Sequence, residues 1–276
     1  MVELIADESY DLNNTIEYNL SIQVSLDGFS FIITDSKNQN LIAFKNELLK
    51  ISSEGFIARR IEEWIDSLEI LKKSYRQVRI LFYTNNFTLI PETFYSEEKN
   101  GELFDKLFEP VKNRIIKVNT LSTISSKLIF GIQNGLDAEL NKRFDNFSYL
   151  HPVEILLQNL PETTNSHEGK ILLLLSSDVL YVLIFKEKNL LIANSYKHFH
   201  FNDIVYFILS NLQQCEIDAG EAKLFMTGNL SGDNQNDIAI NLKKYLGSVE
   251  LLKSSLNFKP EIFDSSEFQN SLFLIK

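Results

Sequence analysis

Two histidines, His198 and His200, lie two residues apart, a spacing that would place both imidazoles on one face of a β-strand. Imidazole pairs are common zinc ligands, but no third ligand is evident in the sequence. We therefore interpret the pair as a polar edge before a helix that is expected to start near Asn202. The single cysteine, Cys215, excludes an internal disulfide and a cysteine-based metal cage, and we expect it at a helix end. The sequence predicts no metal site.

Acidic residues between positions 92 and 105 form a second group that could do chemistry as paired carboxylates. They are Glu92, Glu97, Glu98, Glu102 and Asp105. Because apolar residues are interspersed among them, the segment is typical of an amphipathic element with a solvated face. No nucleophile elbow, P-loop, zinc-protease helix or dinucleotide fingerprint is present. We therefore name no catalytic residue, and the sequence favours a protein that is not an enzyme.

Composition narrows the choice of partners. The chain has 276 residues, 44% of them hydrophobic, and a net charge of −10 without any cluster of lysine or arginine. Such a surface repels nucleic-acid phosphates and anionic lipid headgroups. No apolar run is long enough to cross a bilayer, and the first residues do not read as a secretory signal. We expect a cytoplasmic protein whose partner is another protein, with no nucleic acid and no membrane insertion.

The elements that would position any site form an internal repeat. Residues 25–43 and 176–193 both run through a turn, an apolar strand, a second turn and another strand. An amphipathic helix follows each, with apolar positions spread over 57–71 in the first copy and 205–212 in the second. Ser53 is a candidate cap of the first helix. The repeated order predicts an α/β protein with a duplicated unit.

A third match follows the two helices. Residues 81–86 read LFYTNN and residues 224–229 read LFMTGN, which are identical at four of six positions. We align these words as equivalent strand ends, so that Asn85 corresponds to Gly228.

Between and around the two copies, other elements set the domain boundary. Residues 117–121 and 127–132 are expected to pair as strands, and the polar run at 162–169 is the candidate boundary loop. We assign residues 1–150 to a first lobe and residues 151–276 to a second.

This order of elements resembles the plan of the actin, heat-shock chaperone and sugar-kinase superfamily. More narrowly, Leu20-Ser21-Ile22 leading into Asp27-Gly28-Phe29-Ser30-Phe31, followed by Thr88-Leu89-Ile90-Pro91, resembles an uncharacterised Bacteroidetes family with an actin-like ATPase fold. The resemblance runs over most of the chain. It implies two duplicated lobes of mixed sheet plus helices, the ribonuclease H-like architecture, and a function that is unknown.

Active members of that superfamily hold nucleotide phosphates with an Asp-x-Gly loop at the first hairpin of each lobe, and a glycine pair contacts adenosine. Here Ser25-Leu26-Asp27 and Ser176-Ser177-Asp178 lie at the hairpin positions, so serine replaces the metal-facing aspartate and aspartate replaces the glycine. A carboxylate in that place repels phosphate oxygens. If nucleotide binds, the resemblance implies that Asp27, Gly28, Asp178 and Gly228 contact it; otherwise these residues form ordinary turns.

The leading hypothesis is an actin-like protein without ATPase activity and without a cofactor, a pseudoenzyme that acts as a scaffold or protein-interaction module. The alternative is a genuine ATP-binding ATPase or phosphotransferase, with Mg-ATP held by degenerate phosphate loops. An enzyme of unrelated chemistry is a third reading, for which the sequence offers no candidate residue.

Overall fold

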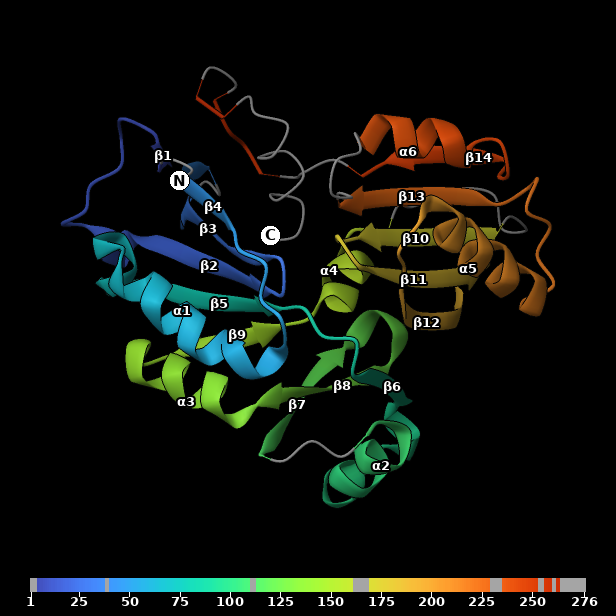
Figure 1. Cartoon of the computed structure of the whole chain (residues 1–276), viewed down its shortest axis with the longest axis horizontal. Helices are drawn as coiled ribbons and strands as arrows, with labels where there is room; N and C mark the ends of the chain where they lie inside the picture. Colours follow the sequence, from blue (N-terminus) through green and yellow to red (C-terminus); the bar gives the residue numbers. More distant parts are fainter. Residues whose placement is uncertain are drawn as a thin grey trace. The chain divides into compact units, whose positions relative to one another are not determined.

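The computed structural model describes residues 4–37, 40–109, 113–160, 169–228, 235–252, 256–259 and 262–263 (Figure 1). Contacts divide the chain into two compact units. The first comprises Met1–Asn119, Lys127–His151 and Ser255–Lys276, and the second comprises Thr120–Ser126 and Pro152–Ser254. The chain therefore passes from the first unit to the main segment of the second after His151, one residue from the expected boundary. Two segments differ from the predicted lobes: Thr120–Ser126 belongs to the second unit, and the residues after 254 belong to the first.

The first unit is built on a six-stranded sheet. Its order is β1 (Ile5–Ala6), β4 (Leu41–Leu48), β3 (Gly28–Asp35), β2 (Tyr18–Ser25), β5 (Gln77–Phe82) and β9 (Phe147–Leu150). Strands β2, β3 and β4 are antiparallel, whereas β5 and β9 join in parallel. Helices α1 (Ile57–Asp66) and α3 (Asn134–Arg143) lie side by side along this sheet (Figure 1). Trp64 of α1 packs its ring 5.3 Å from Phe29 and 5.9 Å from Phe31.

A smaller sheet completes the first unit in the order β6 (Phe87–Pro91), β8 (Ser126–Gln133) and β7 (Arg114–Leu121). The expected strand pair at 117–121 and 127–132 falls on β7 and β8. Helix α2 (Asn100–Leu107) precedes β7. The short 3₁₀ segments of the chain are Thr15–Glu17, Glu54–Phe56, Glu69–Lys72, Glu92–Phe94, Glu97–Lys99 and Ser122–Ile124.

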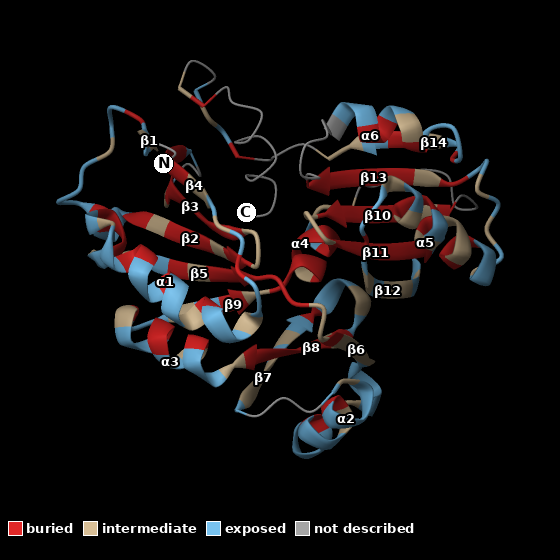
Figure 2. Ribbon diagram, in the orientation of Figure 1, coloured by how far each residue is buried: buried red, intermediate tan, exposed pale blue. Residues whose placement is uncertain are grey.

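The second unit has a five-stranded sheet ordered β12 (Asn189–Lys197), β11 (Val179–Lys186), β10 (Gly169–Leu175), β13 (Lys223–Gly228) and β14 (Ser248–Leu251). Its helices are α4 (Pro152–Gln158), α5 (Phe201–Gln214) and α6 (Gln235–Leu242). Alternate side chains of β10 and β11 form one buried cluster with α5 and α6, while α4 contacts the same two strands. Figure 2 shows β10 and β11 as buried along their length. Central strands covered in this way read as nearly continuous apolar runs.

Both units share one strand plan. The order β4-β3-β2-β5-β9 in the first matches β12-β11-β10-β13-β14 in the second, with the same antiparallel and parallel pairings. Both also have a register shift at the same place in the second strand, between Ile33 and Thr34 and between Ile184 and Phe185. A shared irregularity is stronger evidence for duplication than shared order alone, because bulges are specific local features.

The alignment of the third sequence match was wrong by three residues. Val24 precedes the first turn and pairs with Phe82, while Leu175 precedes the second turn and pairs with Gly228. Gly228 is therefore equivalent to Phe82 and not to Asn85. Short apolar strand ends of similar composition can match by chance, whereas pairing with the neighbouring strand fixes the true register.

Local features at the helix ends differ in part from expectation. Ser53 makes no capping hydrogen bond through its side chain, and a 3₁₀ turn precedes α1 instead. Cys215 follows the last residue of α5, as expected. Residues 162–168 of the candidate boundary loop lie outside the described residues.

Candidate functional site

The turn between β2 and β3 holds the first pair of candidate ligand residues, Asp27 and Gly28. Ser25 Oγ donates to the carbonyl of Gly28 at 3.2 Å and accepts the N–H of Asp27 at 3.2 Å. The chain after β4 closes over the turn, because the N–H of Leu49 donates to the carbonyl of Asp27 at 2.9 Å. The hydroxyl of this serine is thus used inside the turn, as donor and as acceptor.

The turn between β10 and β11 repeats part of this bonding. Ser176 donates to the carbonyl of Val179 through both its N–H (2.8 Å) and its Oγ (3.0 Å). The N–H of His198 donates to the carbonyl of Asp178 at 2.9 Å, in the place that Leu49 takes in the first unit. The imidazole adds a bond of its own, since Nε2 of the buried His198 lies 3.0 Å from the carbonyl oxygen of Ser176. The second turn is therefore locked by a histidine that the first turn lacks.

His198 and His200 have different structural roles, and neither lies on a strand. β12 ends at Lys197; His198 closes the turn, and His200 is the N-cap residue of α5. Asp203 accepts the N–H groups of Phe199 and His200, each at 2.9 Å, and these bonds lower its pKa. The described residues contain no group of histidine, cysteine and acidic side chains that could hold a metal.

Backbone geometry accounts for both candidate glycines. Gly28 has a φ of +131° and Gly228 a φ of +90°, which side chains rarely adopt. A Cβ would lie 2.1 Å from the carbonyl oxygen of Glu47 at Gly28, and 1.9 Å from that of Leu175 at Gly228. Each glycine is needed where neighbouring strands approach closely, so neither requires a ligand to explain it.

The strand register shows which candidate residues meet. Asp27 and Gly28 follow the end of β2 in the first unit, and Asp178 follows the end of β10 in the second. Gly228 ends β13, which is parallel to β10, so Asp178 and Gly228 both lie at the C-terminal ends of neighbouring strands in the second sheet. Whether any of the four contacts nucleotide stays a prediction.

Two titratable groups near these strand ends were not singled out from the sequence as functional. Burial, and then the charge of Asp27, raise the pKa of Tyr83, whose N–H donates to the carbonyl of Val24 at 3.0 Å. His151 is fully buried between the rings of Phe87 and Phe130, and its Nε2 lies 3.0 Å from the carbonyl oxygen of Thr84. Burial lowers the pKa of His151 to about 3, so the imidazole is neutral at physiological pH.

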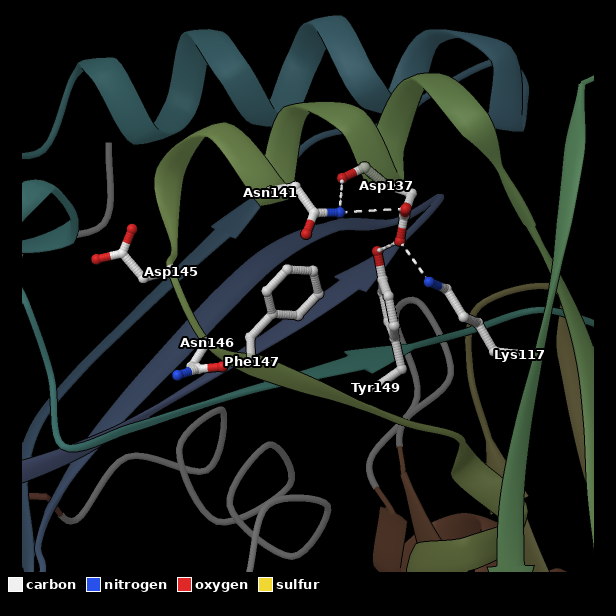
Figure 3. Close-up of a pocket in the computed structure, with 7 residues that line it drawn as sticks. All are labelled: Lys117, Asp137, Asn141, Asp145, Asn146, Phe147 and Tyr149. Carbon is white, nitrogen blue, oxygen red and sulfur yellow. Dashed lines mark hydrogen bonds and ion pairs between the residues drawn. The ribbon is translucent and has the colours of Figure 1, made fainter.

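A polar pocket of about 190 Å³ lies among β7, α3 and β9 of the first unit (Figure 3). Asp137 lines it on α3 and accepts hydrogen bonds from Tyr149 (3.0 Å) and Asn141 (3.1 Å), with Lys117 at 2.7 Å. Burial, and then this carboxylate, raise the pKa of Tyr149. The remaining lining residues are Asp145, Asn146 and Phe147. Because the central carboxylate is already surrounded by donors, this cluster serves to hold the three elements together.

The acidic segment does not converge on a site. All five of its carboxylate residues are exposed, as expected of a solvated face. Glu92, Glu102 and Asp105 pair separately with Lys127, Lys106 and Arg114.

An exposed aromatic surface lies on the second unit, along β12 and the start of α5. Phe199 is 81% exposed, Tyr206 65% and Leu191 45%. The ring of Tyr196 stacks on Phe207 with centroids 4.3 Å apart, and Tyr206 meets the same ring edge-on. We call Tyr196, Tyr206 and Phe207, whose rings are in contact, together with the exposed Phe199, the β12–α5 surface. Phe201, the first residue of α5, packs against the core.

No helix in the described part of the chain is long and apolar enough to cross a membrane.

Comparison with known proteins gives a family and a fold. The family model described as "Protein of unknown function (DUF3822)" matches residues 7–249. A crystal structure from Bacteroides thetaiotaomicron VPI-5482, of a protein with actin-like ATPase fold and unknown function, is 24% identical; the match covers 88% of this chain and 93% of that one, with a TM-score of 0.76. Among curated proteins, none is similar at the sequence level.

A second solved structure, the PilM-PilN type IV pilus biogenesis complex, matches at 11% identity with a TM-score of 0.57, covering 95% of this chain and 96% of the other. These likenesses confirm the expected actin-like fold.

Proposed function

We propose that this chain, which belongs to the DUF3822 family of proteins of unknown function, is an actin-like scaffold that binds another protein and does not turn over ATP. The observation that carries the proposal is the bonding inside the two hairpin turns. In both, a serine hydroxyl is consumed by its own turn, and the backbone carbonyl of the aspartate is taken by the chain that follows the third strand. Both serine hydroxyls are therefore engaged within their own turns.

Electrostatics supports the same proposal. Asp27 and Asp178 would put a carboxylate beside the phosphates of ATP, and two like charges about 4 Å apart repel by roughly 4 kcal/mol at an effective dielectric constant near 20. The net charge of −10 adds to the repulsion of a nucleotide. A site of this kind needs a strong counter-charge, and the sequence places no lysine or arginine within either turn.

Binding of another protein is supported by two further observations. The β12–α5 surface exposes aromatic side chains, a residue class enriched in protein interfaces. One solved structure with a similar fold is that of the PilM-PilN type IV pilus biogenesis complex. The fold is thus compatible with a role in assembly.

ATP binding remains the alternative function, and one observation favours it. Asp178 and Gly228 both lie at the C-terminal ends of neighbouring strands in the second unit, and Asp27 lies at the corresponding strand end in the first unit. In this alternative, Asp27 and Asp178 carry magnesium and Gly228 lies against the nucleotide.

Thermal unfolding with and without millimolar Mg-ATP distinguishes the two functions. A ligand at a hundred times its Kd stabilises the native state by about 2.7 kcal/mol, which raises the midpoint by several degrees. We expect no rise for the wild type, for Asp178→Ala, or for the charge-matched control Glu97→Ala. A rise in the wild type and the control that is lost in Asp178→Ala would establish ATP binding and overturn the proposal.

A further inference from the structure

The outer side of helix α5 carries no charge. The structure describes all 14 residues of this helix, and only Asp203 among them has a charged side chain. Asp203 is half-buried, and its carboxylate accepts the N–H groups of Phe199 and His200. The exposed residues of α5 are Asn202, Tyr206, Gln213 and Gln214 (Figure 2). All of them are uncharged.

The equivalent helix of the first unit has the opposite character. In the shared strand plan, α1 follows β4 as α5 follows β12. Every exposed residue of α1 is charged: Arg59, Arg60, Glu62, Glu63 and Asp66. Charged outer faces are usual for surface helices, because water solvates them well and they do not attract other apolar surfaces. The uncharged outer side is therefore a property of α5 and not of the duplicated plan.

Large aromatic side chains extend this uncharged side. Phe199 lies two residues before α5 and is 81% exposed, and Tyr206, in the first half of the helix, is 65% exposed. Both belong to the β12–α5 surface. Depletion of charge together with enrichment of aromatic residues is the composition of the buried centre of a protein interface.

The polar groups on this side of the helix suit one partner in particular. The amides of Asn202, Gln213 and Gln214 and the hydroxyl of the half-buried Ser210 each both donate and accept hydrogen bonds. None of these side chains forms a hydrogen bond with another described residue. Across a two-fold axis, each group faces its own copy or the copy of a neighbour. Groups that both donate and accept can pair in this way, whereas a charged group would meet a like charge.

We propose that the outer side of α5, with Phe199, is an interface with a second copy of this chain, in which two α5 helices pack antiparallel about a two-fold axis. Such a contact closes after two copies. The antiparallel arrangement also opposes the two helix dipoles. The inference rests on the proposed protein-binding function and names the partner of the β12–α5 surface.

The size and charge of the contact set its strength. A helix of 14 residues is about 21 Å long, so the contact is small and the dimer is reversible, with a Kd in the micromolar range. The net charge of −10 on each copy opposes association. Because the contact itself is uncharged, salt screens this repulsion without weakening any attraction between the copies.

Sedimentation equilibrium of the full-length protein, between about 1 and 200 μM, measures the monomer–dimer equilibrium. We expect a dimer that forms within this range. We also expect a lower Kd when NaCl is raised from about 0.05 to 0.5 M, because the repulsion between the copies is then screened. A dimer that salt dissociates would be held by ion pairs, and the uncharged interface would be refuted.

Matched variants locate the contact. Tyr206→Glu places a carboxylate from each copy in the interface and should raise the dimer Kd at least about tenfold. Its control, Phe94→Glu, makes the same change in charge at a ring of the first unit that is 80% exposed, and should leave the Kd nearly unchanged. Phe199→Ala should also raise the Kd, whereas Phe94→Ala should not. Thermal unfolding of dilute protein checks the fold, and Phe199→Ala decides the question if Tyr206→Glu does not fold.

Other outcomes overturn the inference in different ways. A chain that stays monomeric over the whole concentration range, or a dimer that Tyr206→Glu and Phe199→Ala leave unchanged, refutes the α5 contact. Polymers longer than a dimer refute its two-fold closure. If a pull-down from cell extract recovers a different protein with the monomeric wild type but not with Tyr206→Glu, the surface belongs to that partner and protein binding stands. Failure of the scaffold function itself appears separately, as stabilisation by Mg-ATP.

Discussion

The two units follow the same five-strand plan but complete it in different ways. In the first, β1 and the described residues near the C-terminus cover the edge strand β4; the N–H of Leu41 donates to the carbonyl of Asn257, and Lys259 pairs with Asp7 at 2.6 Å. In the second, the corresponding strand β12 has no such cover among the described residues. Among the described residues, the duplicated plan thus has one edge strand that pairs with a further strand, β4, and one that does not, β12.

Glycine is also distributed differently over the shared plan. The first turn needs Gly28, whereas Val179 takes that place in the second turn. At the end of the first parallel strand the order is reversed, with Phe82 in the first unit and Gly228 in the second. The features that persist are the serine and aspartate of the turns, part of their hydrogen bonding and the register shift, whereas the glycines do not persist. A candidate site that is assigned from glycine positions alone therefore changes when the alignment of the two units shifts by a few residues.

The largest expected effect is at Gly228. Gly228→Ala combines a positive φ with a Cβ placed against the Leu175 carbonyl, and we expect a loss of at least about 3 kcal/mol in the free energy of unfolding. The control Gly101→Ala, where a Cβ meets nothing within 4 Å in α2, should be neutral or stabilise by up to about 1 kcal/mol. Urea unfolding measures both. A small effect at Gly228 would mean that the strand ends are not closely paired, and the aligned register would fail with it.

The next largest effect is a loss of stability at acid pH that arises from the buried His151 of the first unit. His151 belongs to the first unit and has a pKa of about 3 when folded, against 6.5 for an ordinary imidazole. As the pH falls below 6.5, protons bind the unfolded chain first, so stability is lost progressively down to about pH 3. Between pH 7 and pH 5 this amounts to about 2 kcal/mol.

His151→Phe keeps a ring between Phe87 and Phe130 but removes the titrating group. The variant should lose about 2 kcal/mol less than the wild type between pH 7 and pH 5, as measured by urea unfolding at both values. Hydrogen exchange should show the acid effect in β5 of the first unit. Parallel curves for the two proteins would mean that His151 is solvated and titrates normally.

The smallest effect compares the two turn serines. Ser25 Oγ makes two hydrogen bonds within its turn and Ser176 Oγ makes one, so Ser25→Ala should cost about 1–2 kcal/mol and Ser176→Ala about 1 kcal/mol or less. Urea unfolding of the two variants tests this order. The reverse order would show that the histidine-locked second turn depends on its hydroxyl more than the geometry indicates.

The repeat, the strand pairs and the actin-like fold could be predicted because they depend on local patterns: apolar strands bounded by turn residues, and helices with one apolar stripe. Long-range pairing could not be predicted in this way. The cover of β4 joins Leu41 to Asn257, and nothing local to either residue signals the other. The correct equivalence of Gly228 and Phe82 likewise depends on which residue of the neighbouring strand each one faces.

The turns show the same limit on a smaller scale. Ser25, Asp27, Ser176 and Asp178 were identified as the turn residues from their spacing, and they are. The role of His198 was missed because its imidazole bonds to Ser176, which is remote in sequence. Its spacing from His200 suggested a strand, but β12 ends one residue earlier. The burial of His198 and its bond to Ser176, neither of which the sequence reveals, distinguish the two histidines.

The division of the chain into units also affects the order in which the two units can finish folding during synthesis. The segment Pro152–Ser254 of the second unit is continuous, so most of that unit can fold as soon as it leaves the ribosome. Most of the first unit is translated earlier, yet the bond from Leu41 to Asn257 and the ion pair of Asp7 with Lys259 cannot form until the last part of the chain is made. The half of the protein that is made first is therefore finished last, because a nascent chain halted before residue 257 would lack the bonds that Asn257 and Lys259 make to Leu41 and Asp7.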